Sequence, residues 1–161
     1  MEGSEEARLQ REQLERYLKW CEEEGGVELP THLDTFHLQE QKDRLAWLKD
    51  HCEGSVLEAG CCYGFVLAHC GGQVGLDINE HNIALARILN PRKVFVQGDI
   101  RQLPFPDEFV DTVMIPDCLE HLAWEDVEKA LAEAMRVARK KVLISIPNAA
   151  NITRHASRFK H

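Results

Sequence analysis

The sequence has no run of the roughly 18 consecutive apolar residues that a membrane-spanning helix requires. Its first residues, MEGSEEARLQREQLERY, are charged and lack the apolar stretch of a secretion signal. A membrane-embedded or exported protein is therefore not expected, and we predict a cytoplasmic location. Internal repeats and low-complexity segments are also lacking, so the 161 residues fit one compact unit.

The six cysteines include no CxxC pair and no zinc-ribbon spacing; they stand at positions 21, 52, 61, 62, 70 and 118. Without an export signal, reduced thiols are the default state. An alternative is a soft metal site built from Cys61, Cys62, His69, Cys70 and Cys118. Because their spacing fits no known closed site, we predict no bound metal.

No acidic residue follows Glu133, although acids exceed Lys and Arg by 27 to 19 over the whole chain. The net charge of −8 makes nucleic-acid binding by the general surface unlikely on physical grounds, because a phosphate backbone repels an acidic surface. Basic residues follow Glu133 at positions 136, 139, 140, 141, 154, 158 and 160. They are interpreted either as a solvated helix end with a loose tail or as a local site for an anionic substrate.

From Ser55 onward, the sequence contains short apolar runs that alternate with helical patterns. The runs predict strands at 55–59, 73–78, 93–97, 109–115 and 141–146, and helices are predicted at 64–70, 80–89 and 124–139. This alternation predicts an α/β fold, a Rossmann-like doubly wound and mainly parallel sheet with helices on both faces. Two further helices, at 5–23 and from about 31 to 51, precede the first strand. We divide the chain into a helical lid at 1–52 and a ligand-binding domain at 53–161.

Three acidic residues, Glu58, Asp77 and Asp99, stand at or near the carboxyl ends of the first three predicted strands. Ligands of open parallel sheets bind outside these strand ends. Asp77 follows Glu58 by nineteen positions, a distance that suits an acid holding ribose hydroxyls. This pattern fits an adenosine-containing ligand of either the nicotinamide or another class.

Two features separate these ligands. A carboxylate at Glu58 would repel the pyrophosphate of NAD, and Gly60 and Gly64 do not fit the glycine spacing of a dinucleotide loop. The sequence also has no Tyr-x-x-x-Lys pair, since Tyr17 and Tyr63 are its only tyrosines. An NAD-dependent reductase is thus disfavoured, and a ligand that carries positive charge is favoured.

The motifs VLEAGCCYG, VGLDIN, VQGDIRQLPFPDEFVDTV, DCLEHL and ALAEAMRVARKKVLISIPN follow one another in this order. Their order and spacing resemble the class I S-adenosylmethionine-dependent methyltransferases, in particular the broad group with an LEHL segment, over about residues 31–150. The resemblance implies S-adenosyl-L-methionine as the cofactor. It implies four positions that shape the pocket for the methionine part: Glu58, Gly60, Cys62 and Gly64.

The resemblance also implies contacts for the rest of the cofactor. Asp77 would hold the ribose hydroxyls and Ile78 would pack on the adenine. Asp99 and Ile100 would contact the adenine edge, and Asp117 would close the pocket after the fourth strand.

One position departs from the pattern that the resemblance implies. The family loop usually reads E-x-G-x-G-x-G, and Cys62 replaces its middle glycine. A small side chain is compatible with the loop if Cys62 has a negative φ and its Cβ turns aside. We therefore expect a retained and somewhat tighter cofactor site.

Methyl transfer to a hydroxyl, amine or thiol that must lose a proton requires a base. We predict Asp117, His121 and His37 as catalytic residues, with Glu120 and His32 as further candidates. The alternative for the histidines is structural: His121 would cap or pack its loop, and His37 would form a pocket wall.

The resemblance ends at the fifth strand, because the family's C-terminal antiparallel hairpin is apparently absent from this sequence. The fifth strand would then be an unprotected edge, covered by the tail or by a second subunit in a homodimer, unless the natural protein is longer. We predict a methyltransferase with a small-molecule acceptor, for which the basic segment favours an anionic one, and without nucleic acid or membrane as partner. The alternative is a non-catalytic S-adenosylmethionine-binding module or partner subunit.

Overall fold

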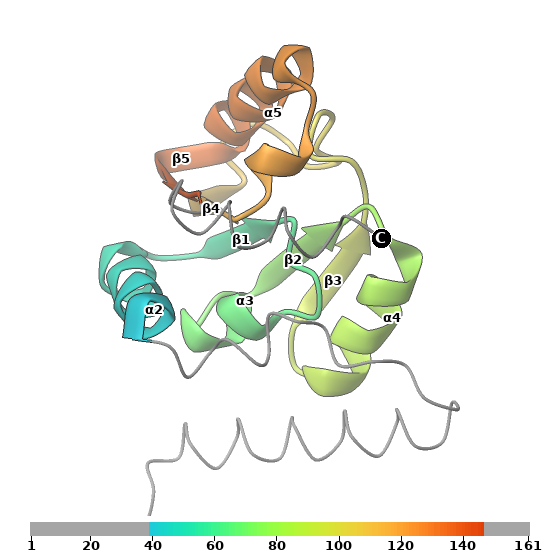
Figure 1. Cartoon of the computed structure of the whole chain (residues 1–161). Helices are drawn as coiled ribbons and strands as arrows, with labels where there is room; N and C mark the ends of the chain where they lie inside the picture. The colour runs from blue at the N-terminus through green and yellow to red at the C-terminus, as the bar shows by residue number, and fades with distance from the viewer. Residues whose placement is uncertain (1–38, 147–161) are drawn as a thin grey trace, which may run out of the picture.

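The computed structural model describes residues 39–146, which form one parallel sheet covered by helices (Figure 1). The five strands lie in the order β3-β2-β1-β4-β5, and every neighbouring pair is parallel. They are β1 (Val56–Ala59), β2 (Val74–Asp77), β3 (Val94–Gln97), β4 (Val110–Pro116) and β5 (Ala138–Ser145). The predicted parallel α/β sheet is confirmed.

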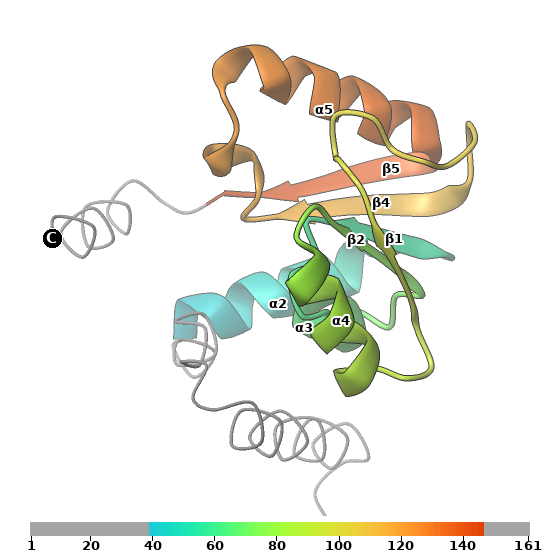
Figure 2. The same ribbon diagram turned by 90° about the vertical axis from the view of Figure 1, so that its right-hand side faces the viewer.

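Helices cover both faces of the sheet, as predicted (Figure 2). One face carries α2 (Gln39–His51), α3 (Phe65–His69) and α4 (Glu80–Leu89), and the other carries α5 (Trp124–Val137). A short 3-10 helix, η1 (Leu119–His121), follows β4. The central strands read as continuous apolar runs because both of their faces are buried.

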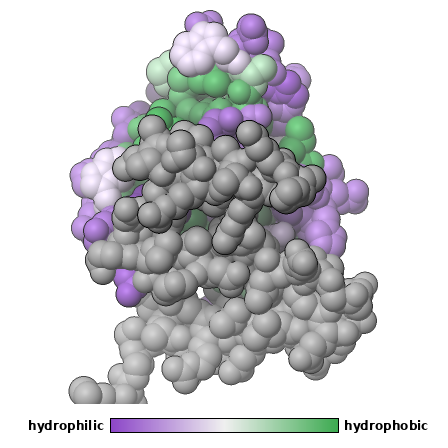
Figure 3. Space-filling view, viewed as in Figure 1, coloured by the Kyte–Doolittle hydropathy of each residue, from purple (hydrophilic) through white to green (hydrophobic). Residues whose placement is uncertain are grey.

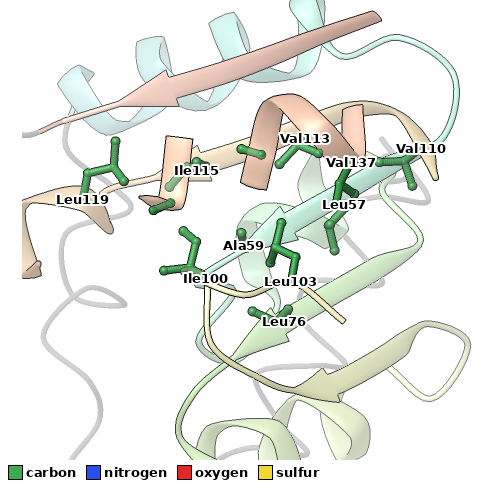
Figure 4. Close-up of a cluster of buried hydrophobic side chains, with 12 residues drawn as sticks. Leu57, Ala59, Leu76, Ile100, Leu103, Val110, Val113, Ile115, Leu119 and Val137 are labelled. Carbon is green, nitrogen blue, oxygen red and sulfur yellow. The ribbon is translucent and has the colours of Figure 1, made fainter. Parts of the chain in front are cut away.

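Each face of the sheet has its own cluster of buried side chains. Leu57, Leu76 and Val113 pack against α5 and the segment that follows β3 (Figure 4). On the opposite face, Leu48 of α2 and Leu67 of α3 are completely buried. Leu48 makes α2 part of the core, whereas the predicted lid residues 1–38 lie outside the described residues.

The boundary between α5 and β5 differs from the sequence prediction. The helix was expected to reach residue 139 and the strand to begin at 141, but α5 ends at Val137 and β5 begins directly at Ala138. Ala138 pairs with Val110 of β4, so ladder hydrogen bonding replaces the last predicted turn of helix. Helical propensity could not show this, because the strand partner lies far away in the sequence.

The strand order creates a switch point between β1 and β4. The chain passes from β1 to β2 and β3 on one side, then returns to place β4 and β5 on the other. Ligands of such sheets bind at the carboxyl ends of the two strands beside the switch. Within residues 39–146, β3 and β5 are the edge strands, and no helix of this part is long and apolar enough to cross a membrane.

Candidate functional site

The loop between β1 and α3 requires glycine at two positions. Gly60 has φ +80°, and a Cβ added there would lie 2.5 Å from the sulfur of Cys118. Gly64 has φ +78°, and its added Cβ would lie 2.7 Å from Cζ of Phe95. Left-handed backbone and close packing therefore exclude other residues at both ends of the loop.

Cys62 contradicts the expectation of a negative φ, because its φ is +49°. The chain reverses tightly between Gly60 and Gly64, and this turn forces the middle residue into the left-handed region. A glycine, which the family usually has at this position, adopts that region without steric strain, whereas a cysteine does not. A hydrogen bond stabilises this left-handed conformation: the Cys62 amide donates to Oδ2 of Asp77 at 2.9 Å. The loop is thus tied directly to the end of β2.

Asp77 organises the end of β2 as well as the loop. Its Oδ1 accepts from the Asn79 amide at 2.9 Å and from the Asn82 side chain at 3.2 Å, at the start of α4. A carboxylate offers about four acceptor positions, and these three bonds leave about one. Asp77 lies where the resemblance places it, but binding both ribose hydroxyls requires it to exchange one of these partners.

Glu58 is the most deeply buried charged side chain near the loop, with 2% of its surface exposed. Burial raises its pKa well above the ordinary value, while a backbone hydrogen bond from Leu67 and the nearby Arg44 oppose the change. Its Oε2 has no hydrogen-bond partner among the described residues. A buried acceptor without a partner is costly, so this oxygen points to a missing polar ligand.

Arg44 of α2 is a site residue that the sequence analysis missed. Its guanidinium pairs with Asp117, the residue directly after β4, and its charge also acts on Glu58. Its Nε is buried without a partner in the described part of the chain. No sequence signal marked Arg44, since one cation in a charged helix carries no motif.

Asp117 has a left-handed backbone, with φ +48°. Its amide donates to the Ser145 carbonyl at 2.9 Å, and the Ser145 hydroxyl donates to its Oδ1 at 3.1 Å. These bonds and Arg44 fix the carboxylate at the ends of β4 and β5. Glu58, Cys62, Asp77 and Asp117 are therefore gathered around the switch point.

The positions predicted for adenine are exposed to different degrees. Ile78 follows β2 and keeps 63% of its surface exposed, which suits an apolar ring. Asp99 is paired with Arg101 at 2.6 Å, and this pairing lowers the Asp99 pKa. The Ile100 side chain lies in the core at 7% exposure, so only its backbone remains for contact with a ligand.

Two of the predicted base candidates after β4, Glu120 and His121, are neighbouring exposed residues of η1. Partial burial of the Glu120 carboxyl raises its pKa, and the charge of Asp117 adds to the effect. His37 and His32 lie outside the described residues. Within residues 42–146, no three His, Cys, Asp or Glu side chains converge as metal ligands.

An apolar hollow of about 510 Å³ opens beside η1, which begins two residues after Asp117. It is lined by residues of η1, α5 and the end of β5: Leu119, Glu120, Leu122, Trp124, Val127, Ile144 and Ile146. Trp124 is 78% exposed, and Figure 3 shows hydrophobic residues gathered at the top of the view, where α5 lies in Figure 1. Among residues 42–146, no Lys or Arg lines this hollow.

A family described as a methyltransferase domain matches residues 57–146, more than half of the chain. The glycine loop, the acid at the end of β2 and the sheet order define a class I S-adenosylmethionine-dependent methyltransferase fold. The chain belongs to this methyltransferase domain family, whose cofactor is S-adenosylmethionine.

Individual relatives agree with the family. A probable S-adenosylmethionine-dependent methyltransferase of Mycolicibacterium smegmatis is 37% identical over 108 residues, 63% of this chain and 41% of the relative. Norajmaline N-methyltransferase of Rauvolfia serpentina is 30% identical over 95 residues, 52% of this chain and 32% of the relative. The chain thus spans less than half the length of these relatives.

Solved structures match the fold. A methyltransferase of Thermotoga maritima, described as a possible histamine N-methyltransferase, superposes with TM-score 0.67 at 23% identity, covering 81% of this chain and 64% of that one. A Pyrococcus horikoshii protein gives TM-score 0.63 at 25% identity, covering 76% of this chain and 62% of that one.

Proposed function

We propose that this chain is the cofactor-binding part of a methyltransferase that transfers a methyl group to a small-molecule acceptor. The observation that carries the proposal is the buried Oε2 of Glu58, which has no hydrogen-bond partner among the described residues and stands two positions before the glycine loop. An oxygen in this position suits a polar, positively charged group of a ligand, and it does not suit a pyrophosphate.

The residues present fit the cofactor. Glu58 and the loop from Gly60 to Gly64 would hold its methionine part, and Arg44, whose charge acts on Glu58, would be the cation available to a ligand carboxylate. Asp77 would hold the ribose, and the exposed Ile78 would pack on the adenine. When bound, the cofactor supplies a methyl group on a positively charged sulfur.

In the reaction, the chain's own residues would position the cofactor and the acceptor relative to each other and would exclude water from the site. Asp117 is fixed by Arg44 and Ser145, so it would mark a rigid border between the cofactor and the acceptor. Glu120 is the base candidate that the geometry favours, since it lines the apolar hollow and its pKa is raised. An acceptor that needs no proton removal would need no base.

The hollow beside η1 supports an acceptor with an apolar body. Its size falls in the range of about 300–1,000 Å³ that is usual for small-ligand pockets. The name of the norajmaline methyltransferase indicates a small molecule as acceptor of that relative. A small apolar acceptor is therefore our proposal for this chain.

An anionic acceptor gains no support from the described basic residues. Arg136 pairs with Glu133 and Asp107, and Arg139 pairs with Asp111 at 2.8 Å. Lys140 pairs with Glu53 at 2.6 Å. Arg139 and Lys140 lie at the beginning of β5, and the acceptor hollow lies at its opposite end.

The alternative is a chain that binds the cofactor but does not turn it over. The specific observation that favours it is coverage, because the match extends over only 41% of the Mycolicibacterium smegmatis relative. A catalytic chain and a binding module share the same loop and acids, so binding alone does not separate them.

Calorimetry with S-adenosylmethionine, S-adenosylhomocysteine and NAD tests the cofactor. We expect binding of the first two and none of NAD; binding of NAD alone would overturn the proposal. Release of S-adenosylhomocysteine in the presence of a panel of apolar amines and alcohols tests transfer. Cofactor binding without release for any acceptor would favour the non-catalytic alternative.

A further inference from the structure

Arg101 links the segment after β3 to the first turn of α5. Its Nε donates to both oxygens of Asp99, at 2.9 and 3.0 Å, and its Nη2 donates to Asp99 Oδ2 at 2.6 Å. On the other side, Nη1 donates to Oδ2 of Asp126 at 2.7 Å. Asp126 is itself held by Lys129, whose Nζ donates to its Oδ1 at 2.9 Å. The guanidinium of Arg101 is therefore fixed between two carboxylates.

Asp99 follows a segment that is bonded to the residues proposed to bind the ribose and the adenine. The Gly98 amide donates to the Asp77 carbonyl at 3.0 Å, and the Gln97 side chain donates to the Ile78 carbonyl at 3.2 Å. These bonds join the end of β3 to the end of β2. Asp99 thus comes directly after a residue that is attached to the proposed cofactor site.

The Asp99 carboxylate has little acceptor capacity left. Besides the two side-chain groups Nε and Nη2, the Arg101 amide donates to Asp99 Oδ1 at 2.8 Å. A carboxylate offers about four acceptor positions, and these three donors leave about one. One free position matches one N–H of the exocyclic amine of adenine.

We propose that Arg101 is a positioning residue for adenine recognition, which holds the Asp99 carboxylate in the orientation that accepts one N–H of the exocyclic amine. The inference rests on the proposed cofactor function and adds a residue to it. Arg101 acts through Asp99, because it stops the rotation of this side chain before the cofactor binds. The contact with Asp126 of α5 keeps the guanidinium itself in place.

Two effects of Arg101 on the proposed hydrogen bond oppose each other. Its positive charge makes Asp99 a weaker acceptor, whereas the fixed orientation favours binding. The Arg101 side chain is 40% exposed and that of Asp99 is 32% exposed, so water screens the charge. Stopping the motion of a free side chain on binding lowers affinity by about two- to tenfold. The fixed orientation therefore outweighs the charge.

The test is calorimetry of the full chain with S-adenosylhomocysteine and with its analogue that has unsubstituted purine in place of adenine and so lacks only the exocyclic amine. The parent chain should bind S-adenosylhomocysteine about tenfold more tightly, because the analogue cannot donate to a carboxylate. Arg101→Gln should reduce this preference to about two- to threefold, through weaker binding of S-adenosylhomocysteine alone. The full preference in this variant would overturn the proposal.

Arg101→Lys separates orientation from charge. Lysine keeps the positive charge but lacks the planar fork that contacts both carboxylates, so it should lose as much of the preference as Arg101→Gln does. If the lysine variant kept the full preference, charge alone would suffice and the positioning role would be wrong.

The matched control is Arg139→Gln, since Arg139 is also paired with an aspartate, Asp111 at 2.8 Å, and lies at the beginning of β5. It should keep the full preference. A general structural defect in Arg101→Gln would weaken both ligands alike and would leave their ratio unchanged, an outcome that contradicts the proposal.

The anchor on α5 has its own variant. Asp126→Ala frees the far side of the Arg101 guanidinium and should give a preference between those of the parent and of Arg101→Gln. An unchanged preference would contradict the anchoring role of Asp126.

The parent chain by itself separates the two proposals. If it does not bind S-adenosylhomocysteine, the proposed function is wrong and the role of Arg101 is wrong with it. If it binds both ligands equally tightly, the cofactor assignment stands and only the roles of Asp99 and Arg101 are overturned.

Discussion

At the scale of single residues, Cys62 combines a side chain with a backbone conformation that glycine prefers. Cys62→Gly should raise the free energy of unfolding by about 0.5–1 kcal/mol, because relief of left-handed strain exceeds the added freedom of the unfolded chain. Urea unfolding measures the change, and cofactor affinity should stay equal or improve slightly.

The matched control is Cys62→Ala, which removes the thiol and keeps the strain. It should give no gain in stability. If Cys62→Gly instead weakened cofactor binding tenfold, the thiol would have to make a ligand contact that outweighs the relief of strain.

Glu58 is expected to make stability depend on pH. Burial raises its pKa above the ordinary 4.5, so the folded protein disfavours the ionised form. The contribution of Glu58 to stability is thus fully present below that ordinary value and is lost as pH rises through the raised pKa. Glu58→Gln avoids this loss and should be more stable than the parent by about 1–3 kcal/mol at pH 8, with little difference near pH 4.5.

Thermal unfolding of both proteins across this pH range checks the prediction. A Gln variant that is less stable at pH 8 would mean that attraction between ionised Glu58 and Arg44 exceeds the cost of burial. The same variant should bind the cofactor more weakly, because an amide lacks the charge of the carboxylate.

Asp77 holds the loop and is also proposed to hold the ribose. Asp77→Ala should lower cofactor affinity by about 2–4 kcal/mol and should also lower Tm, because the Cys62 and Asn79 amides lose their acceptor. Calorimetry and thermal unfolding measure the two effects. Asp50→Ala, at an exposed carboxylate of α2, is the control and should change neither.

At the scale of elements, α2 is held to the sheet by a completely buried leucine. Leu48→Ala should cost about 2–5 kcal/mol of unfolding free energy, since it opens a cavity between α2 and the sheet. Trp47→Ala removes a larger side chain but should cost less, because Trp47 is 45% exposed and its stacking partner in the described part of the chain is His51 of the same helix. Denaturant unfolding compares the two; an equal loss would place α2 outside the core.

At the scale of the whole molecule, the residues proposed to bind the cofactor lie between Arg44 and Asp117, within the described part. Deleting residues 1–30 should therefore leave cofactor affinity within about tenfold, roughly 1.4 kcal/mol. The predicted lid would be lost, so transfer to the acceptor should be abolished. Calorimetry and an assay of product release separate these effects, and unchanged transfer would exclude a lid role for this segment.

The sequence predicted the strands and helices of the sheet because burial on both faces leaves short apolar runs with acids at their ends. It placed Glu58 and Asp77 at or near the carboxyl ends of the first two strands, where they lie in β1 and β2, since motif spacing reflects positions along consecutive strands. The end of α5 was wrong by two residues, because pairing of Ala138 with Val110 overrides local helical preference. The homodimer, the lid and the cytoplasmic location remain predictions.

Contacts between distant segments were decided only by the tertiary structure. Arg44 meets Asp117 across 73 positions, and Gly60 must be glycine because Cys118 lies against it. The positive φ of Cys62 likewise depends on how the loop after β1 meets the end of β2. Sequence patterns indicate which face of a helix or strand is buried. Which residue of another element contacts that face is determined by the packing of the whole sheet and its helices.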